Sequence, residues 1–133
     1  LAGVCGTDPF RVMRRFLNDV RDAGFSGVQN FPTVGLIDGQ FRQNLEETGM
    51  GFDKEVAMIA AAREVGLLTC PYVFTEAEAA AMAAAGADVL IPHMGLTTKG
   101  TIGAKTAMTL ADAAARVQAL CDAAKAVNPD VLV

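Results

Sequence analysis

The chain has 133 residues, of which 52% are hydrophobic and 20% charged, and its 11 Lys and Arg against 15 Asp and Glu give a net charge of -4. This composition is typical of one small, ordered globular domain. The acidic balance argues against a nucleic-acid partner or an anionic membrane surface, because both attract clustered Lys and Arg. No apolar run reaches the roughly 18 to 20 residues of a membrane span, and no signal peptide precedes the first predicted strand. We therefore expect a cytoplasmic protein.

The first predicted elements are a strand and a helix. Residues 1–5 form a short apolar strand, after which Asp8 can cap a helix and Pro9 can occupy its first turn. Apolar side chains then recur at helical spacing from Phe10 to Val20, and Gly24 ends the helix.

The second predicted strand, residues 27–31, opens into a long irregular stretch, residues 32–52, with a short helix around residues 41–47. Asp53 is expected to cap the next helix, which ends at Gly66, and residues 67–73 form the third strand. One side of this helix carries Val56, Ile59, Ala60 and Arg63.

Two further helices frame the fourth strand, residues 88–92. Residues 75–78, Thr-Glu-Ala-Glu, have the capping-box pattern and begin an alanine-rich helix that ends at Gly86. Thr109 begins a helix that ends at Asn128, and residues 131–133 begin a fifth strand. One face of the last helix carries Leu110, Ala113, Val117, Leu120, Cys121 and Ala124.

Strands that alternate with helices predict a parallel sheet, because each crossover needs a helix to return the chain to the same sheet edge. An open doubly wound sheet and a (β/α)8 TIM barrel both fit this order. The short strands, the long loops at their carboxyl ends and the lack of a Gly-x-Gly-x-x-Gly turn after the first strand favour the barrel.

Five strands are about half of a barrel of roughly 250 residues. The chain also starts without Met and stops inside an apolar run. We therefore expect residues 1–133 to form one partial TIM-barrel domain that lacks amino- and carboxyl-terminal strands, and we expect the full-length protein to be a homo-oligomer.

The candidate functional residues follow the predicted strands, because the reactive groups of barrels sit at the carboxyl ends of the strands. Of the amides at positions 29 and 30, one should face the barrel interior and can orient a carboxylate. These ligand-binding candidates are Gly6, Thr7, Gln29, Asn30, Thr33 and Tyr72.

The fourth strand runs into the single histidine, His93, and then into a loop rich in Gly, Thr and Lys. Glycine lets a backbone approach a ligand closely, and Thr and Lys supply donors and charge, so the loop suits a small phosphorylated or carboxylated molecule. The loop candidates for binding this anion are Thr97, Thr98, Lys99 and Gly100. A P-loop is excluded because Ala104 replaces its required glycine.

Three acidic residues and His93 are the candidates for metal binding and catalysis. Asp8 is either a helix cap or a metal ligand, and Glu46 and Glu47 either hold Mg²⁺ and act as acid and base or are exposed residues at a helix end. His93 can move a proton or meet a phosphoryl oxygen, although a lone histidine is more often structural.

Five sequence runs closely resemble the phosphoenolpyruvate hydrolase-like TIM-barrel family, which is related to the barrel domain of Tm-1-type proteins. These runs are residues 1–10, 27–39, 45–51, 71–74 and 93–98, so the resemblance spans the chain. It implies chemistry on phosphoenolpyruvate. Similarity to the phosphoenolpyruvate mutase and isocitrate lyase barrels further implies a divalent metal ion.

The leading hypothesis is a hydrolase or lyase that acts on a small phosphorylated or 2-oxo carboxylic acid with help from Mg²⁺. The competing hypothesis is a barrel without turnover that senses a ligand or binds a protein partner. Turnover of phosphoenolpyruvate by the full-length protein separates the two.

Overall fold

The computed structural model describes residues 1–96 and 107–133, in which every strand pair is parallel. In the first sheet, β2 (Gly27–Gln29) lies between β1 (Ala2–Gly3) and β3 (Leu68–Thr69). In the second sheet, β4 (Tyr72–Val73) pairs with β5 (Ile91–Pro92). Outside the named strands, Val89 forms an isolated parallel bridge with Leu132. The predicted α/β architecture with parallel strands is confirmed.

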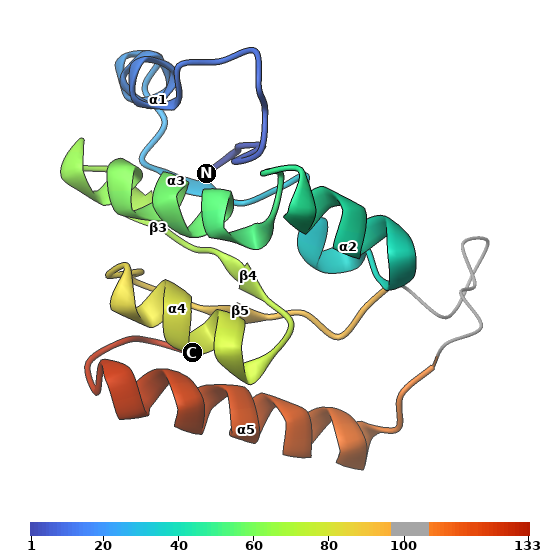
Figure 1. Ribbon diagram of the computed structural model, residues 1–133. Helices are drawn as coiled ribbons and strands as arrows, with labels where there is room; N and C mark the ends of the chain where they lie inside the picture. The colour runs from blue at the N-terminus through green and yellow to red at the C-terminus, as the bar shows by residue number, and fades with distance from the viewer. Residues whose placement is uncertain (97–106) are drawn as a thin grey trace.

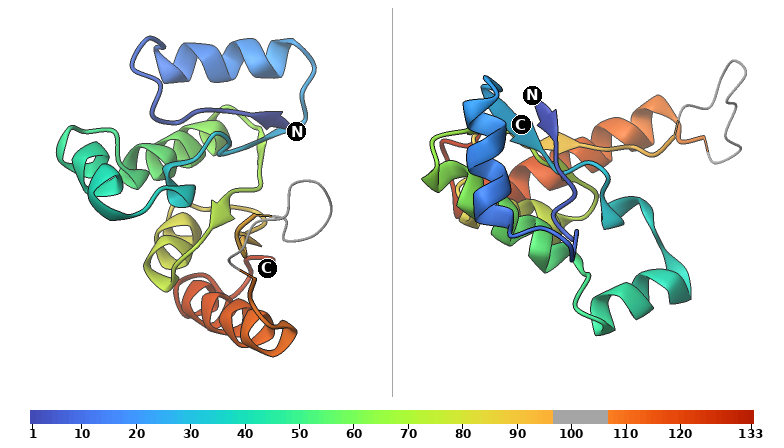
Figure 2. Two further views of the ribbon diagram at one scale, coloured as in Figure 1. Left: turned by 90° about the vertical axis from the view of Figure 1, so that its right-hand side faces the viewer. Right: turned by 90° about the horizontal axis from the view of Figure 1, so that it is seen from above.

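The helices lie in chain order along an arc outside the strands (Figures 1 and 2). They are α1 (Met13–Asp22), α2 (Gly39–Glu47), α3 (Phe52–Glu64), α4 (Glu76–Ala84) and α5 (Leu110–Val127), with a 3-10 turn at Val34–Leu36. Helices α1, α3, α4 and α5 form successive layers, and α2 projects from one end of α3 (Figure 1). Within the described residues, no helix is long and apolar enough to cross a membrane.

The regular strands are shorter than predicted, and the third one is broken. Residues 67–73 form β3 and β4 on either side of Cys70 and Pro71. Pro71 has no N–H to donate to a neighbouring strand, and at this break the chain changes its partner from β2 to β5. The side chain of Asn30 continues the lost pairing, because Tyr72 N donates to Asn30 Oδ1 at 2.6 Å.

Most of the predicted helix ends are confirmed, but two predicted starts are wrong. Helix α4 has the capping box of Thr75 and Glu78, and Thr109 caps α5 through the backbone N–H of Asp112. Helix α1 begins at Met13, so Asp8 caps a turn by accepting from Phe10 N at 2.9 Å instead of capping the helix.

The other wrong start is that of α3. Gly51 occupies its N-cap position, and Asp53 lies inside the first turn, where a carboxylate still interacts favourably with the helix dipole.

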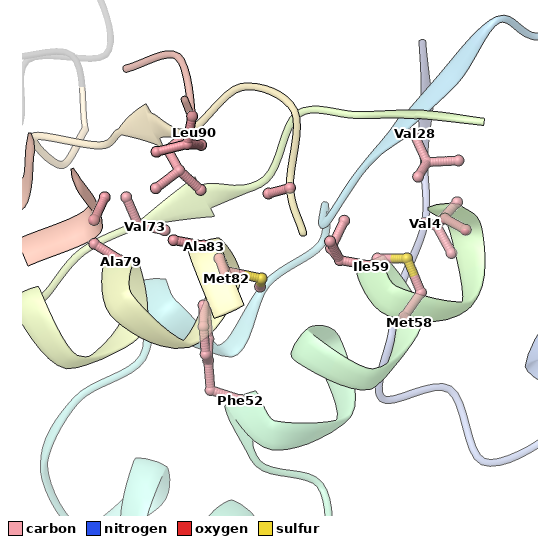
Figure 3. Packing of buried hydrophobic residues seen from close by; sticks show 14 of the residues in the cluster. Val4, Val28, Phe52, Met58, Ile59, Val73, Ala79, Met82, Ala83 and Leu90 are labelled. Carbon is pink, nitrogen blue, oxygen red and sulfur yellow. The ribbon is translucent and has the colours of Figure 1, made fainter. Parts of the chain in front are cut away.

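The core fills the space between the strands and the helices. Met58 and Ile59 of α3 lie beside Val4 and Val28, while Met82 belongs to the neighbouring helix α4 (Figure 3). The faces predicted for α3 and α5 are only partly correct: α3 buries Glu55 together with its apolar residues, and Leu110 of α5 is 91% exposed.

Candidate functional site

An open cleft of about 900 Å³ lies at the carboxyl ends of β4 and β5. It is bounded by the turn after β2, by α2, by the start of α4 and by α5. Its charged and titratable lining residues are Asp38, Arg42, Glu46, Glu78, His93 and Arg116. The cleft therefore brings together two predicted catalytic residues, His93 and Glu46, from distant parts of the chain.

His93 is half-buried between two aromatic rings. The ring centroid of Tyr72 is 5.0 Å away at an interplanar angle of 89°, and that of Phe74 is 5.1 Å away at 39°. The backbone of His93 continues the β4–β5 pairing, since its N–H donates to Val73 O at 2.9 Å. Burial lowers the pKa of His93 below its ordinary value of 6.5, so the imidazole is neutral at physiological pH.

The hydrogen bonding of His93 also selects a tautomer. Gly95 N–H donates to Nδ1 at 3.0 Å, so Nδ1 carries a lone pair and the proton of the neutral ring lies on Nε2. If Nδ1 were protonated, its N–H would face the N–H of Gly95, and neither donor would have an acceptor there. In this tautomer Nε2 is a hydrogen-bond donor, which suits contact with an anionic oxygen better than removal of a proton.

The sequence analysis missed a buried carboxylate next to this cleft, that of Glu55 on α3. Its side chain is fully buried and accepts three hydrogen bonds: from Asn30 Nδ2 at 2.6 Å, from Thr33 Oγ1 at 2.7 Å and from Val34 N at 2.7 Å. Burial raises the pKa of Glu55 above its ordinary value, with the three hydrogen bonds opposing this shift and the charge of Glu78 adding to it.

Helical periodicity could have located Glu55, because it lies three residues after Phe52 and three before Met58 on the buried face of α3. A carboxylate on such a face needs several donors. The partners of Glu55 include two predicted ligand-binding residues, Asn30 and Thr33, both of which are buried. The amide of Asn30 does orient a carboxylate, as predicted for position 29 or 30, but this carboxylate belongs to the protein itself.

Arg42 connects α2 to the rest of the cleft. Its guanidinium lies 2.6 Å from Glu46 and 3.1 Å from Glu78, and it donates to Val34 O at 2.9 Å. The neighbouring Glu47 is exposed, accepts from Gln43 Nε2 and does not line the cleft. The structure thus separates the adjacent glutamates: Glu46 faces the candidate site and Glu47 does not.

Arg116 of α5 is a second residue that the sequence analysis missed. It lines the cleft, and its Nη2 donates to Phe74 O at 2.6 Å, which fixes the guanidinium at the end of β4. Among the described residues, no carboxylate forms an ion pair with Arg116, whereas Arg42 has two such partners. No sequence signal distinguished it from the other exposed residues of a long helix.

The remaining predicted site residues are scattered. Asp8 forms an ion pair with Arg11 at 3.2 Å, and Thr7 Oγ1 lies 3.5 Å from Cys5 Sγ. Gly6 packs against α3, where an added Cβ would come within 2.9 Å of Glu55 Cα. Gln29 pairs through its backbone in β2. The predicted anion-binding residues Thr97, Thr98, Lys99 and Gly100 lie outside the described residues.

The acidic residues do not assemble a metal site in the described part of the chain. No group of three or more His, Cys, Asp or Glu side chains is placed there to hold a metal ion. Asp8 and Glu46 are instead engaged with Arg11 and Arg42.

Comparison with known proteins gives one family and a small set of relatives. The model of the family described as phosphoenolpyruvate hydrolase-like matches residues 1–133. Two tomato (Solanum lycopersicum) proteins, "ToMV susceptible protein tm-1(GCR26)" and "ToMV resistance protein Tm-1(GCR237)", are each 62% identical over the whole chain. A bacterial protein from Sinorhizobium fredii, "Putative transcriptional regulatory protein y4pA", is 35% identical over 130 residues, which is 98% of the chain.

These relatives are much longer than the chain. The chain spans 18% of each tomato protein and 21% of the bacterial one. The similarity therefore concerns one segment of each relative.

Proposed function

Because the chain belongs to the phosphoenolpyruvate hydrolase-like family, we propose that it forms part of a (β/α)8 barrel whose mouth binds a small phosphorylated or 2-oxo carboxylic acid and acts on it. The observation that carries this proposal is the cleft at the carboxyl ends of β4 and β5, which is lined by both His93 and Glu46. In barrels this end of the strands holds the reactive groups. The arc of helices outside the parallel strands supports the same architecture.

Arg116 and His93 would recognise the anion. A guanidinium forms bidentate hydrogen bonds with carboxylate or phosphate oxygens. The neutral imidazole of His93 would donate its Nε2–H to a second oxygen and stabilise negative charge that develops there. This role agrees with the bond from Gly95 to Nδ1, whereas proton transfer would require Nδ1 to be released or Nε2 to lose its proton.

Mg²⁺ would add charge neutralisation at the substrate oxygens. No group of three or more His, Cys, Asp or Glu side chains among the described residues is placed to hold the ion, so we assign these residues no step that runs through it. Their contribution is to bind and orient the anion. The homo-oligomer, the cytoplasmic setting and Mg²⁺ itself stay predictions.

The test is turnover of phosphoenolpyruvate by the full-length protein, with pyruvate and phosphate release measured at several Mg²⁺ concentrations. Arg116→Gln should weaken phosphoenolpyruvate binding by about 10- to 100-fold, the range for a lost charge-assisted hydrogen bond. Arg14→Gln is the matched control, because Arg14 is an exposed arginine of α1 that pairs with Glu64. Equal affinity in both variants would remove Arg116 from the site.

His93→Gln separates the two chemical roles of His93. The amide keeps a hydrogen-bond donor but cannot carry a proton near neutral pH. Partial activity would support the donor role, and loss of turnover with binding retained would support proton transfer. Full activity with unchanged binding would remove His93 from the mechanism.

The alternative function is a ligand-sensing or protein-binding barrel without turnover. It is favoured by the names of the relatives, which refer to ToMV susceptibility or resistance and to a transcriptional regulatory protein. Binding of phosphoenolpyruvate without product release would support this alternative.

A further inference from the structure

We propose that Glu55 is a positioning residue that fixes His93 through two arms, one by way of Asn30 and Tyr72 and the other by way of the 33–35 turn and Phe74. This inference rests on the proposed role of His93 in the cleft. Glu55 itself does not line that cleft, so it would act through the residues that it holds.

The first arm begins at the amide of Asn30. Glu55 accepts from Asn30 Nδ2 at 2.6 Å, and this bond fixes which way the amide faces. Asn30 Oδ1 then accepts from Tyr72 N at 2.6 Å, and Asn30 Nδ2 also donates to Tyr72 O at 3.2 Å. The Tyr72 backbone is thus held as if by a neighbouring strand, and its ring meets His93 at 5.0 Å.

The second arm begins at the turn after β2. Glu55 accepts from Thr33 Oγ1 and from Val34 N, both at 2.7 Å. These bonds set the position of Gly35, where an added Cβ would lie only 2.1 Å from the Phe74 ring. Phe74 in turn packs against His93 at 5.1 Å. Both aromatic walls around His93 therefore depend on the same buried carboxylate.

The chemistry of the site requires a carboxylate and not merely a polar side chain. One oxygen of Glu55 faces the donors of Asn30 and Thr33, and the other faces Val34 N–H. A glutamine amide in either orientation would place its NH₂ group against at least one of these donors. Glu55→Gln should therefore keep the size of the side chain while releasing at least one arm.

The experiment follows His93 directly in the full-length protein. Diethyl pyrocarbonate acylates the neutral imidazole, and peptide mass spectrometry assigns the product to His93, so the rate against pH reports its pKa and accessibility. In the wild type we expect slow acylation with a midpoint below the ordinary 6.5, because His93 is partly buried. In Glu55→Gln we expect faster acylation with a midpoint closer to 6.5. We also expect a roughly 10- to 100-fold loss of phosphoenolpyruvate affinity or turnover, the range known for residues that orient the ligands of metal sites.

The control variant is Glu47→Gln, which changes an exposed carboxylate outside the cleft and should leave the acylation of His93 unchanged. If Glu55→Gln does not fold, Thr33→Val and Asn30→Ser each disturb one arm. They should shift the acylation rate and midpoint pH of His93 in the same direction, but by less. Unchanged His93 reactivity in the folded variants would overturn the inference. A shift in His93 in a protein whose wild type neither binds nor turns over phosphoenolpyruvate would support the positioning role and count against the proposed function.

Discussion

Glu55 and the pair Glu46 and Glu47 show how much the setting of a carboxylate decides its role. Glu55 is fully buried and accepts three hydrogen bonds from fixed donors. Glu46 lies on a helix with no buried residue, with 41% of its side chain accessible, and pairs with the guanidinium of Arg42. The buried carboxylate holds other residues in place, whereas the exposed one reaches the cleft, where a ligand role for it stays a prediction.

The same difference separates the two sides of the cleft. On the strand side, His93 is held by Tyr72, Phe74 and the Gly95 N–H. On the opposite side, α2 has no fully buried residue; it is attached through Leu45, which packs against the core, and through the polar contacts of Arg42 and Glu46. A buried strand side with a more exposed helix opposite would suit the proposed binding of a small ligand.

The largest effect is expected when the buried carboxylate is removed. Glu55→Ala should lower the free energy of unfolding by at least about 3 kcal/mol, because three buried donors each lose a partner at a cost of about 1 to 3 kcal/mol. Chemical denaturation of the full-length protein measures this loss, with Glu47→Ala as the matched control. Equal stability of the two variants would show that the buried and exposed carboxylates do not differ as described.

The order of strands and helices was predictable because each element carries its own signal. The capping box at Thr75 and the N-cap at Thr109 are local patterns of hydroxyl and carboxylate groups, and both are confirmed. The start of α1 was wrong because the Asp8-Pro9 pattern also fits an isolated turn, and the choice between turn and helix depends on packing.

The candidate site was less predictable, because its contacts join distant segments. Position after a strand pointed to His93 and a long loop pointed to Glu46, and both residues line the cleft. Their roles stay predictions. The partners of Glu55 come from residues 30 to 34, and Arg116 reaches Phe74 across 42 residues. No local sequence pattern encodes such long-range contacts. The adjacent Glu46 and Glu47 therefore drew attention as a pair, and Glu55 was overlooked.

A smaller effect is expected from overpacking the strand side of the cleft. In Gly35→Ala the new Cβ would meet the Phe74 ring at 2.1 Å, so the ring must move away from its place beside His93. Overpacking of this kind typically costs about 1 to 3 kcal/mol, which thermal or chemical unfolding would measure. Gly39 is unsuitable as a control because its φ of 60° already disfavours alanine. Ala77→Gly, which removes a side-chain atom from the first turn of α4 beside the same cleft, should keep the Phe74 ring in place.

The pH dependence of stability offers a test of the burial of His93. Its pKa is lowered by burial, so its contribution to stability is present above the ordinary value near 6.5 and is lost as pH falls through the lowered folded-state pKa. As the pH falls, the free energy of unfolding of the wild type should therefore decrease relative to that of His93→Gln. A difference that is constant from neutral to mildly acidic pH would place His93 in solvent.

The smallest effect on stability is expected on the exposed side, from Glu46→Gln. The Arg42–Glu46 pair is partly exposed, and such pairs contribute about 0.2 to 1 kcal/mol. Its functional effect should be larger than its effect on stability, because the variant leaves Arg42 with Glu78 as its remaining ion-pair partner and makes the cleft less negative.

If Glu46 also helps to hold Mg²⁺, the neutral amide should raise the Mg²⁺ concentration needed for half-maximal rate, since an amide oxygen is a poorer ligand for a hard cation. Glu47→Gln should leave that concentration unchanged, because Glu47 does not line the cleft. Steady-state rates measured against Mg²⁺ concentration would decide whether Glu46 contributes to metal binding. An identical metal response in Glu46→Gln and Glu47→Gln would limit Glu46 to its pairing with Arg42.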